Sequence, residues 1–146
     1  MSDIKTSDGT PLDGVLQIPR VVFDEISFVR KGFKTESSEI GFQFEQNIEK
    51  VEDSRYNVSL RAAVSKDDEY NATVQITGFC IVNENDPNKD QLLKENAAAI
   101  LFPYIRAELT LITAQPETDS LVLPVINIST MLQKAEMQSN GTPQTP

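Results

Sequence analysis

Histidine and tryptophan are absent from the 146 residues, and cysteine occurs once, at Cys80. A single cysteine cannot form an intramolecular disulfide, and without histidine the usual zinc sites and the Ser-His or Cys-His catalytic pairs are excluded. Basic residues are also scarce, because 13 Lys and Arg stand against 22 Asp and Glu and give a net charge of −9. Nucleic-acid binding depends on Lys and Arg that neutralise phosphates, so we expect no nucleic-acid partner.

Long hydrophobic runs are missing as well. No segment approaches the roughly 20 apolar residues of a membrane-spanning helix, and residues 1–8 contain no apolar signal core, so we expect a cytoplasmic protein without membrane insertion. The run Asp86-x-Asn88-x-Asp90 is superficially similar to a calcium loop, but Gln91 stands where that loop requires glycine. We therefore expect neither a metal nor a cofactor.

The length and the 39% hydrophobic content favour one domain with a modest core. Residues 1–14 are polar and are predicted to be a flexible N-terminal lead. Residues 15–138 form the predicted domain, and the polar residues 139–146 are predicted to be a disordered tail.

Alternating apolar and polar residues predict four strands, which cover residues 15–30, 40–45 with a weaker continuation to 53, 55–65 and 70–82. The last two are predicted to pair as a hairpin across a short charged turn. Pro19 lacks a backbone donor, so the first strand should lie at a sheet edge or carry a bulge there. A shift in its alternation predicts a second bulge between Phe23 and Glu25.

The longest apolar-rich segment, residues 96–115, has a helical period. Pro103 favours a break near Phe102, and Asp90 is a candidate cap for a short preceding helix. Two apolar stripes lie side by side on the main helix, the first of Ala98, Leu101, Phe102, Ile105, Leu109 and Ile112 and the second of Ile100, Tyr104, Ala107 and Leu111. One small sheet cannot cover both stripes, which predicts a homo-oligomer. The predicted interface residues are Ile105, Leu109, Leu111 and Ile112.

Strands followed by helices indicate an α+β fold. After the main helix, residues 121–126 are strongly apolar but contain Pro124, which opposes both a helix and an interior strand. This segment is either a loop that covers the core or the wall of an apolar hollow that a partner fills. A last short helix is predicted from Thr130 to about Gln138.

Two strings in the C-terminal half are specific enough to indicate a family. Ile100-Leu-Phe-Pro-Tyr-Ile-Arg106, and after a helical segment and a turn Leu123-Pro-Val-Ile-Asn127, resemble the SecB export chaperone and its SecB-like relatives. The upstream segments Asp24–Phe28 and Gly78–Ile81 agree in order and character. The resemblance covers residues 15–138.

The resemblance implies a four-stranded antiparallel sheet with two C-terminal helices packed on one face. It also implies dimers paired through strands and main helices, which assemble as a tetramer, a dimer of dimers. Such a protein is an ATP-independent holdase that binds unfolded or nascent polypeptides and delivers them to the translocation motor SecA. The client-binding residues carried over from the family are Phe23, Ile26, Phe28, Leu121, Val122, Leu123, Val125 and Ile126.

Glu25 matches an acidic position used for docking the motor, whereas Val29 and Thr73 stand where further acids of that patch are expected. These departures favour an alternative, a dedicated SecB-like chaperone or adaptor for a single partner such as an antitoxin or a phage protein. An enzyme is not expected, because acidic pairs such as Asp67 and Asp68 lack the apolar surroundings that raise a carboxylate pKa.

Overall fold

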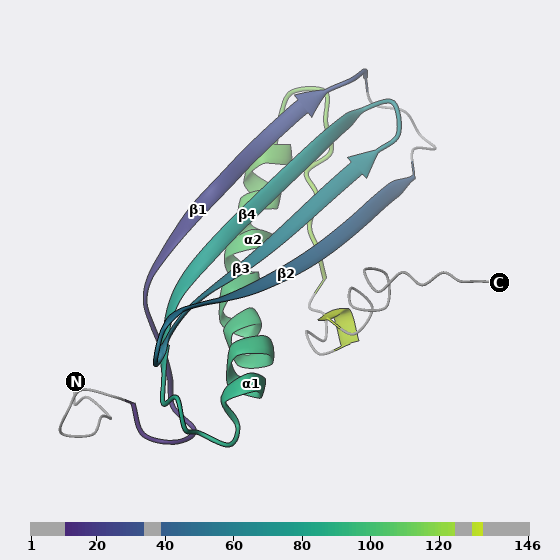
Figure 1. Cartoon of the computed structure of the whole chain (residues 1–146). Helices are drawn as coiled ribbons and strands as arrows, with labels where there is room; N and C mark the ends of the chain where they lie inside the picture. Colours follow the sequence, from purple (N-terminus) through teal and green to yellow (C-terminus); the bar gives the residue numbers. More distant parts are fainter. Residues whose placement is uncertain (1–10, 34–38, 125–129, 133–146) are drawn as a thin grey trace.

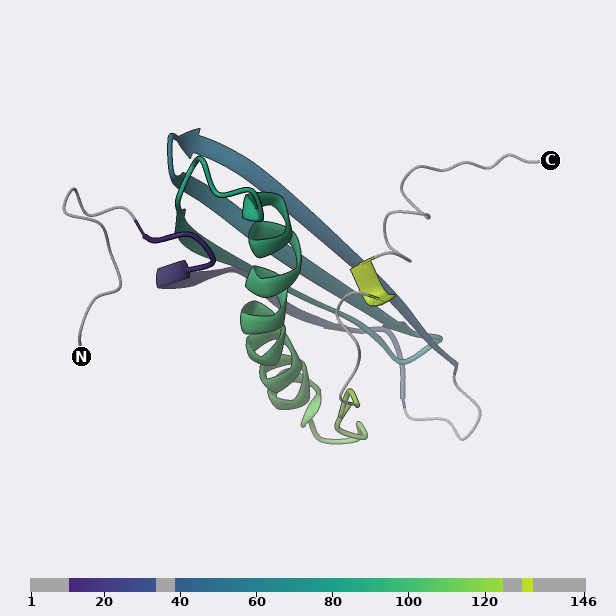
Figure 2. The same ribbon diagram turned by 90° about the horizontal axis from the view of Figure 1, so that it is seen from below.

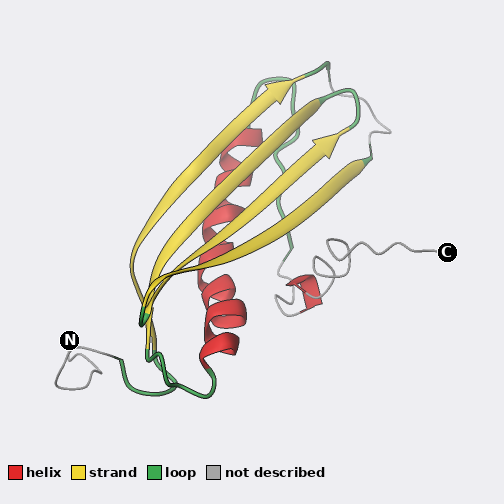
Figure 3. Cartoon of the chain, viewed as in Figure 1, coloured by secondary structure: helices red, strands yellow, loops and turns green. Residues whose placement is uncertain are grey.

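The computed structural model of the chain describes residues 11–33, 39–124 and 130–132. Four antiparallel strands form one sheet in the order β1-β4-β3-β2 (Figure 1). A helical segment follows and lies along one face of the sheet, as Figure 2 and Figure 3 show. The elements are β1 (Leu16–Arg30), β2 (Ile40–Glu52), β3 (Arg55–Lys66), β4 (Tyr70–Val82), α1 (Lys89–Gln91), the π-helix η1 (Leu92–Asn96) and α2 (Ala97–Thr113).

The predicted fold class is confirmed for the sheet and the main helix. Of the predicted last helix, Thr130 to Leu132 are helical and the remainder lies outside the described residues. The predicted hairpin of β3 and β4 is also confirmed, since Lys66 pairs with Tyr70. Asp68 has a φ of 64°, the left-handed conformation that closes such a three-residue turn.

The two faces of the sheet differ as the alternation predicts. The inner face packs against α2 and forms the core; on β3 it carries Tyr56, Val58, Leu60, Ala62 and Val64, all buried. The outer face carries polar side chains that bond to one another, for example Ser59 and Thr77 with 2.8 Å between their hydroxyl oxygens. Every second residue of a strand therefore contributes to the core.

Strand β1 lies at one edge of the sheet, and both predicted bulges are confirmed. The register with β4 shifts between Gln17 and Arg20, around Pro19, and again between Phe23 and Glu25. The second bulge has a consequence for the surface. Without it Phe23 and Ile26, three residues apart, would point to opposite faces; with it they pair with Ile76 and Val74 and share the inner face.

The predicted helix break near Phe102 is wrong, because α2 continues through Pro103 to Thr113. Proline removes one backbone donor and leaves the carbonyl of Ala99, four residues earlier, without its usual partner. Both Ala99 and Pro103 lie on the exposed side of the helix. Water can bond that carbonyl there, which is why the helix tolerates the proline.

The start of the helical segment also corrects the prediction for Asp90. The residue at the cap position is Asn88, without a side-chain cap hydrogen bond. The carboxylate of the buried Asp86 organises this corner instead, since it accepts the N–H of Asn88 at 2.8 Å and that of Gly14. Gly14 is thus tied to the turn after β4, and the flexible lead over residues 1–14 stays a prediction.

Glu84, directly after β4, joins β2, β3 and α1 at one end of the sheet. Its carboxylate accepts the N–H of Ser54 at 2.7 Å, the hydroxyl of Tyr56 at 2.7 Å and the ammonium of Lys89 at 2.9 Å. The ammonium of Lys50 lies 3.3 Å from the same carboxylate. The bond from Ser54, followed by those from Lys89 and Tyr56, holds the pKa of Glu84 well below its usual range.

We expect Glu84→Gln to destabilise the protein at pH 7. A carboxyl group with a lowered native pKa contributes stability above its unfolded pKa, about 4.3 for glutamate, and loses it as the pH falls through the native pKa. The free energy of unfolding, measured by urea denaturation, should therefore differ between parent and variant at neutral pH, and this difference should narrow only below about pH 4. Glu52→Gln at the end of β2 is the control, since the ion pair of Glu52 with Arg55 is exposed and 3.5 Å long. Equal effects of both variants would contradict this role of Glu84.

Candidate functional site

Large apolar side chains are exposed along the boundary between β1 and α2. Helix α2 lies mainly over β4, so it leaves the inner face of the edge strand β1 partly open. We call the set the β1–α2 strip; with their exposed fractions, its members are Phe23 (38%), Ile26 (46%), Ile100 (47%), Tyr104 (44%) and Leu111 (65%). Exposed apolar side chains gathered in this way are typical of a surface that binds another polypeptide.

The strip is continuous between strand and helix. The rings of Phe23 and Tyr104 meet edge to face with 6.4 Å between their centroids. Phe28, the third client-binding residue predicted on β1, behaves differently. Its ring stacks on the ring of Tyr70 with 5.1 Å between the centroids and packs against the core, so Phe28 offers less exposed surface than Phe23 or Ile26.

The two apolar stripes of the main helix α2 differ in their exposure. Ile105 and Leu109, predicted at an oligomer interface, are fully buried against the sheet of their own chain and have no surface left to offer. That part of the prediction is wrong. Leu111 is exposed and Ile112 is partly buried against the core. The second stripe, Ile100, Tyr104, Ala107 and Leu111, lies on the exposed side of α2.

The segment after α2 lies on the other side of the helix. The N–H of Leu121 donates to Thr113 Oγ1 at 2.7 Å, and Thr110 Oγ1 donates to the carbonyl of Leu121 at 2.8 Å. Thr113 is nine residues from Tyr104, which at 3.6 residues per turn is half a turn around the helix. The turn directly after α2 is bound to the end of β1, since Arg30 donates to the carbonyl of Pro116 at 2.7 Å and to the hydroxyl of Thr118. Figure 1 shows that residues 121–124 then run beside α2 on the side of β2.

The predicted client-binding residues thus form two separate groups within one chain. Phe23 and Ile26 flank α2 on one side, and residues 121–123 flank it on the other. Leu121 and Leu123 are partly buried against the core, whereas Val122 is 69% exposed. Val125 and Ile126 lie outside the described residues.

Glu25, the predicted docking acid, points to the outer face of the sheet. Arg61 donates to its carboxylate at 2.6 Å and to Gln75 at 3.0 Å, and Ser27 donates to the same carboxylate at 3.2 Å. The bond from Arg61 lowers the pKa of Glu25, and the bond from Ser27 adds to this while desolvation opposes it. The negative charge is matched by a cation of the same chain.

The other two positions of that patch lie nearby. Ser27 pairs with Thr73 and Val29 pairs with Asn71, so Val29, Thr73 and Glu25 share the outer face. The three positions thus lie on one face of the sheet, and docking of the motor there stays a prediction. The patch nevertheless holds one carboxylate at these positions, and that one is paired with Arg61.

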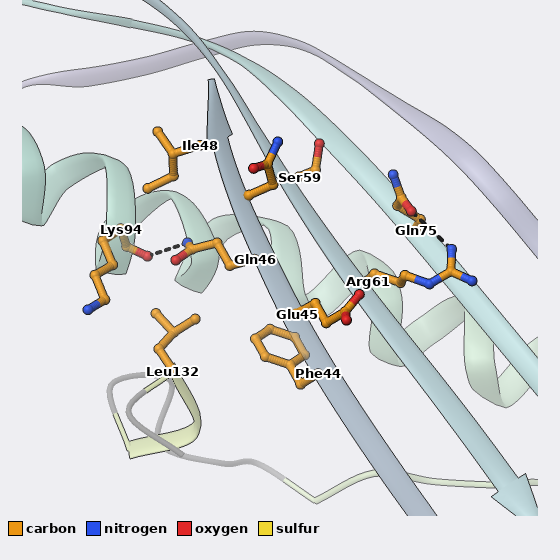
Figure 4. Close-up of a pocket in the computed structure, with 10 residues that line it drawn as sticks. Phe44, Glu45, Gln46, Ile48, Ser59, Arg61, Gln75, Lys94 and Leu132 are labelled. Carbon is orange, nitrogen blue, oxygen red and sulfur yellow. Dashed lines mark hydrogen bonds between the residues drawn. The ribbon is translucent and has the colours of Figure 1, made fainter. Parts of the chain in front are cut away.

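A hollow of about 460 Å³ opens at the edge of β2, where the sequence indicates no site. Figure 4 shows Gln46 pointing from β2 toward the helical segment, where its amide donates to the carbonyl of Lys94 at 2.8 Å. Phe44, Ile48 and Leu132 surround it. The hollow thus lies beside β2, η1 and Leu132, where the amide of Gln46 connects β2 to η1.

Cys80 is buried, and burial raises the pKa of its thiol to about 12. The thiol is therefore protonated at neutral pH and packs as an apolar side chain. Among residues 11–33, 39–124 and 130–132, no cluster of three or more His, Cys, Asp or Glu could hold a metal ion. Within the same residues, no helix is long and apolar enough to cross a membrane.

The family model described as "Preprotein translocase subunit SecB" matches residues 15–139. The chain belongs to the SecB family. An uncharacterised protein of Methanocaldococcus jannaschii is 38% identical over 65 residues, which are 44% of this chain and 42% of that protein. The chain thus matches less than half of the length of this curated relative.

A SecB-like chaperone of Mycobacterium tuberculosis, solved in complex with a peptide of the HigA1 antitoxin, has a similar fold. The TM-score is 0.65 at 15% identity, and the match covers 76% of this chain and 90% of that one. At this identity the likeness shows the SecB-like fold. The resemblance and the fold class predicted from the sequence are both confirmed.

In this SecB-family chain, sequence reasoning missed two sets of site residues. Ile100 and Tyr104 were assigned to an apolar stripe but not to the surface beside β1. Their spacing of four with no polar residue on that side was the available signal. Thr110 and Thr113 interrupt the apolar surface of the main helix. No sequence signal shows that their hydroxyls bind the backbone of Leu121.

Proposed function

We propose that this SecB-family protein is an ATP-independent holdase that binds unfolded or nascent polypeptides. The observation that carries the proposal is the exposure of Phe23 and Ile26 next to the open edge of β1. An edge strand presents unpaired backbone donors and acceptors, and an extended client can add to it as a further strand. The two side chains supply apolar contact, and the net charge of −9 keeps such a surface soluble.

We propose further that the protein works in the cytoplasm as a homo-oligomer, a dimer of dimers. Ile100, Tyr104, Ala107 and Leu111 recur at intervals of four, three and four residues, the spacing with which helices pack against one another. This stripe is the proposed contact between main helices of two copies. Pairing of two copies through strands stays a prediction. The two edge strands of the sheet, β1 and β2, each have an open edge for it, and the sheet alone does not favour one over the other.

The test is suppression of aggregation. A chemically denatured reporter protein is diluted into buffer with and without this chain, and light scattering is followed over time. We expect a near-stoichiometric amount to suppress scattering equally with and without ATP. Unchanged scattering at a several-fold molar excess would contradict the holdase function.

A second candidate is a chaperone dedicated to one partner. The observation that favours it is the pairing of Glu25 with Arg61, because a matched charge is a weak docking point for a motor. The Mycobacterium relative was solved with an antitoxin peptide, so an antitoxin is one partner of this kind. Affinity capture separates the two candidates, since a holdase retains many unrelated unfolded chains and a dedicated chaperone retains one at fixed stoichiometry.

Delivery to SecA is tested at the same pair. Because Arg61 already compensates the charge of Glu25, we expect Glu25→Ala to change the affinity for SecA less than about twofold. Arg61→Ala, which leaves the carboxylate unpaired, is the matched variant. A tenfold loss in Glu25→Ala together with a gain in Arg61→Ala would show that Glu25 docks the motor.

A further inference from the structure

The backbone of Leu121 is held by side chains of α2. Its N–H donates to Thr113 Oγ1 at 2.7 Å and its carbonyl accepts from Thr110 Oγ1 at 2.8 Å. Ser120 Oγ donates to the carbonyl of Thr110 at 3.0 Å. Within the described chain, no backbone–backbone hydrogen bond holds residues 121–124. Two hydroxyl groups therefore bind the backbone N–H and the carbonyl of Leu121, and these bonds do not depend on the type of its side chain.

Thr113 is placed for this task. Its side chain is fully buried, and its hydroxyl donates to the carbonyl of Leu109 at 2.7 Å while it accepts from Leu121. A buried hydroxyl with its own proton already committed is oriented as an acceptor. It therefore selects a backbone N–H in this position.

Residues 121–124, which we call the strap, alternate in burial as a bound extended peptide would. Leu121 and Leu123 pack against the core, while Val122 is 69% exposed and Pro124 is exposed. Contacts at every second side chain combined with hydrogen bonds to the main chain are typical of extended-peptide recognition. In such recognition the hydrogen bonds position the backbone, and the contacts at alternate residues select for apolar side chains.

We infer that the Thr110–Thr113 side of α2 is a second polypeptide-binding site, which the strap occupies in this structure. Its ligand is an extended segment with apolar residues at two alternate positions and a free N–H at the first. The inference rests on the proposed holdase function, because the segment that displaces the strap belongs to a client. It differs from the β1–α2 strip, which lies half a turn away around the helix.

A strap competing from the same chain has a high effective concentration, so a free peptide binds weakly while the strap is seated. The double variant Leu121→Ser plus Leu123→Ser removes the apolar contacts of the strap and leaves α2 unchanged. A labelled heptapeptide with the sequence of residues 118–124 should bind this variant at least about tenfold more tightly than the parent in fluorescence polarisation.

The matched control is the same heptapeptide with an N-methyl group on the residue that corresponds to Leu121. It keeps both leucine side chains but lacks the N–H that Thr113 Oγ1 accepts. We expect its affinity to fall about tenfold, the upper range for one hydrogen bond. Equal affinity of the two peptides for the variant would overturn the inference.

Hydrogen exchange in the parent protein gives a readout that does not depend on a folded variant. We expect exchange of the Leu121 amide to accelerate when a carboxymethylated, permanently unfolded reporter protein is added, because the client displaces the strap. Slower or unchanged exchange, while aggregation is still suppressed, would overturn the strap inference and leave the holdase function intact. Absence of aggregation suppression by the parent would instead contradict the proposed function.

Discussion

Leu109→Asp will abolish folding of the protein. Leu109 is 0% exposed and lies on the face of α2 that packs against the sheet. The change removes a large apolar side chain, worth about 2–5 kcal/mol, and buries a charge without a partner, which costs several kcal/mol more. A domain is stable by about 5–15 kcal/mol, so little or no stability remains. Far-ultraviolet circular dichroism and urea denaturation measure the loss.

Leu111→Asp is the matched control, two residues further along the same helix. Leu111 is 65% exposed, so the charge stays hydrated and the fold of one chain should persist. If the exposed stripe of α2 joins two copies, this variant should reduce the mass measured by light scattering at micromolar concentration. A folded Leu109→Asp variant would contradict the packing of α2. A parent protein that is a monomer at this concentration would contradict the proposed interface.

Phe23→Ser plus Ile26→Ser should weaken client binding by about two orders of magnitude. The exposed parts of the two side chains amount to about 80 Å² each, which at about 25 cal/mol/Å² corresponds to about 2 kcal/mol per side chain. Ordering of the bound client and the area that serine retains lower the sum to about 3 kcal/mol, or a factor of about 100. Titration of the reporter protein in the aggregation assay measures the change.

The control for this variant comes from the same strand. Val22 and Val29 are 42% and 57% exposed, but they pair with Thr77 and Asn71 and point to the outer face. Val22→Ser plus Val29→Ser should therefore leave aggregation suppression within about threefold of the parent. If the two double variants lose activity equally, clients bind the open edge of β1 itself or the outer face. The inner-face strip would then not be the client surface.

Local rules explain how much of the fold was predictable. Residues 55–65 alternate strictly between apolar and polar, and this period alone assigns each side chain to a face of the sheet. Pro19 and the apolar run at residues 21–23 marked both bulges of β1, because a missing donor and a shifted phase are visible in the chain itself. The string from Ile100 to Arg106 was enough to indicate the SecB family, which the match over residues 15–139 confirms.

By itself, then, the sequence determined the strands, the bulge near Phe23, that Pro19 requires a sheet edge or a bulge, and the family. Only the tertiary structure decided which stripe of α2 faces the sheet, that Arg61 pairs with Glu25, and that Thr113 holds the strap on the side of α2 opposite Tyr104. The reason is physical. Periodicity reports which side chains share a face, whereas these contacts join residues 8 to 36 positions apart and depend on how the elements are placed in space.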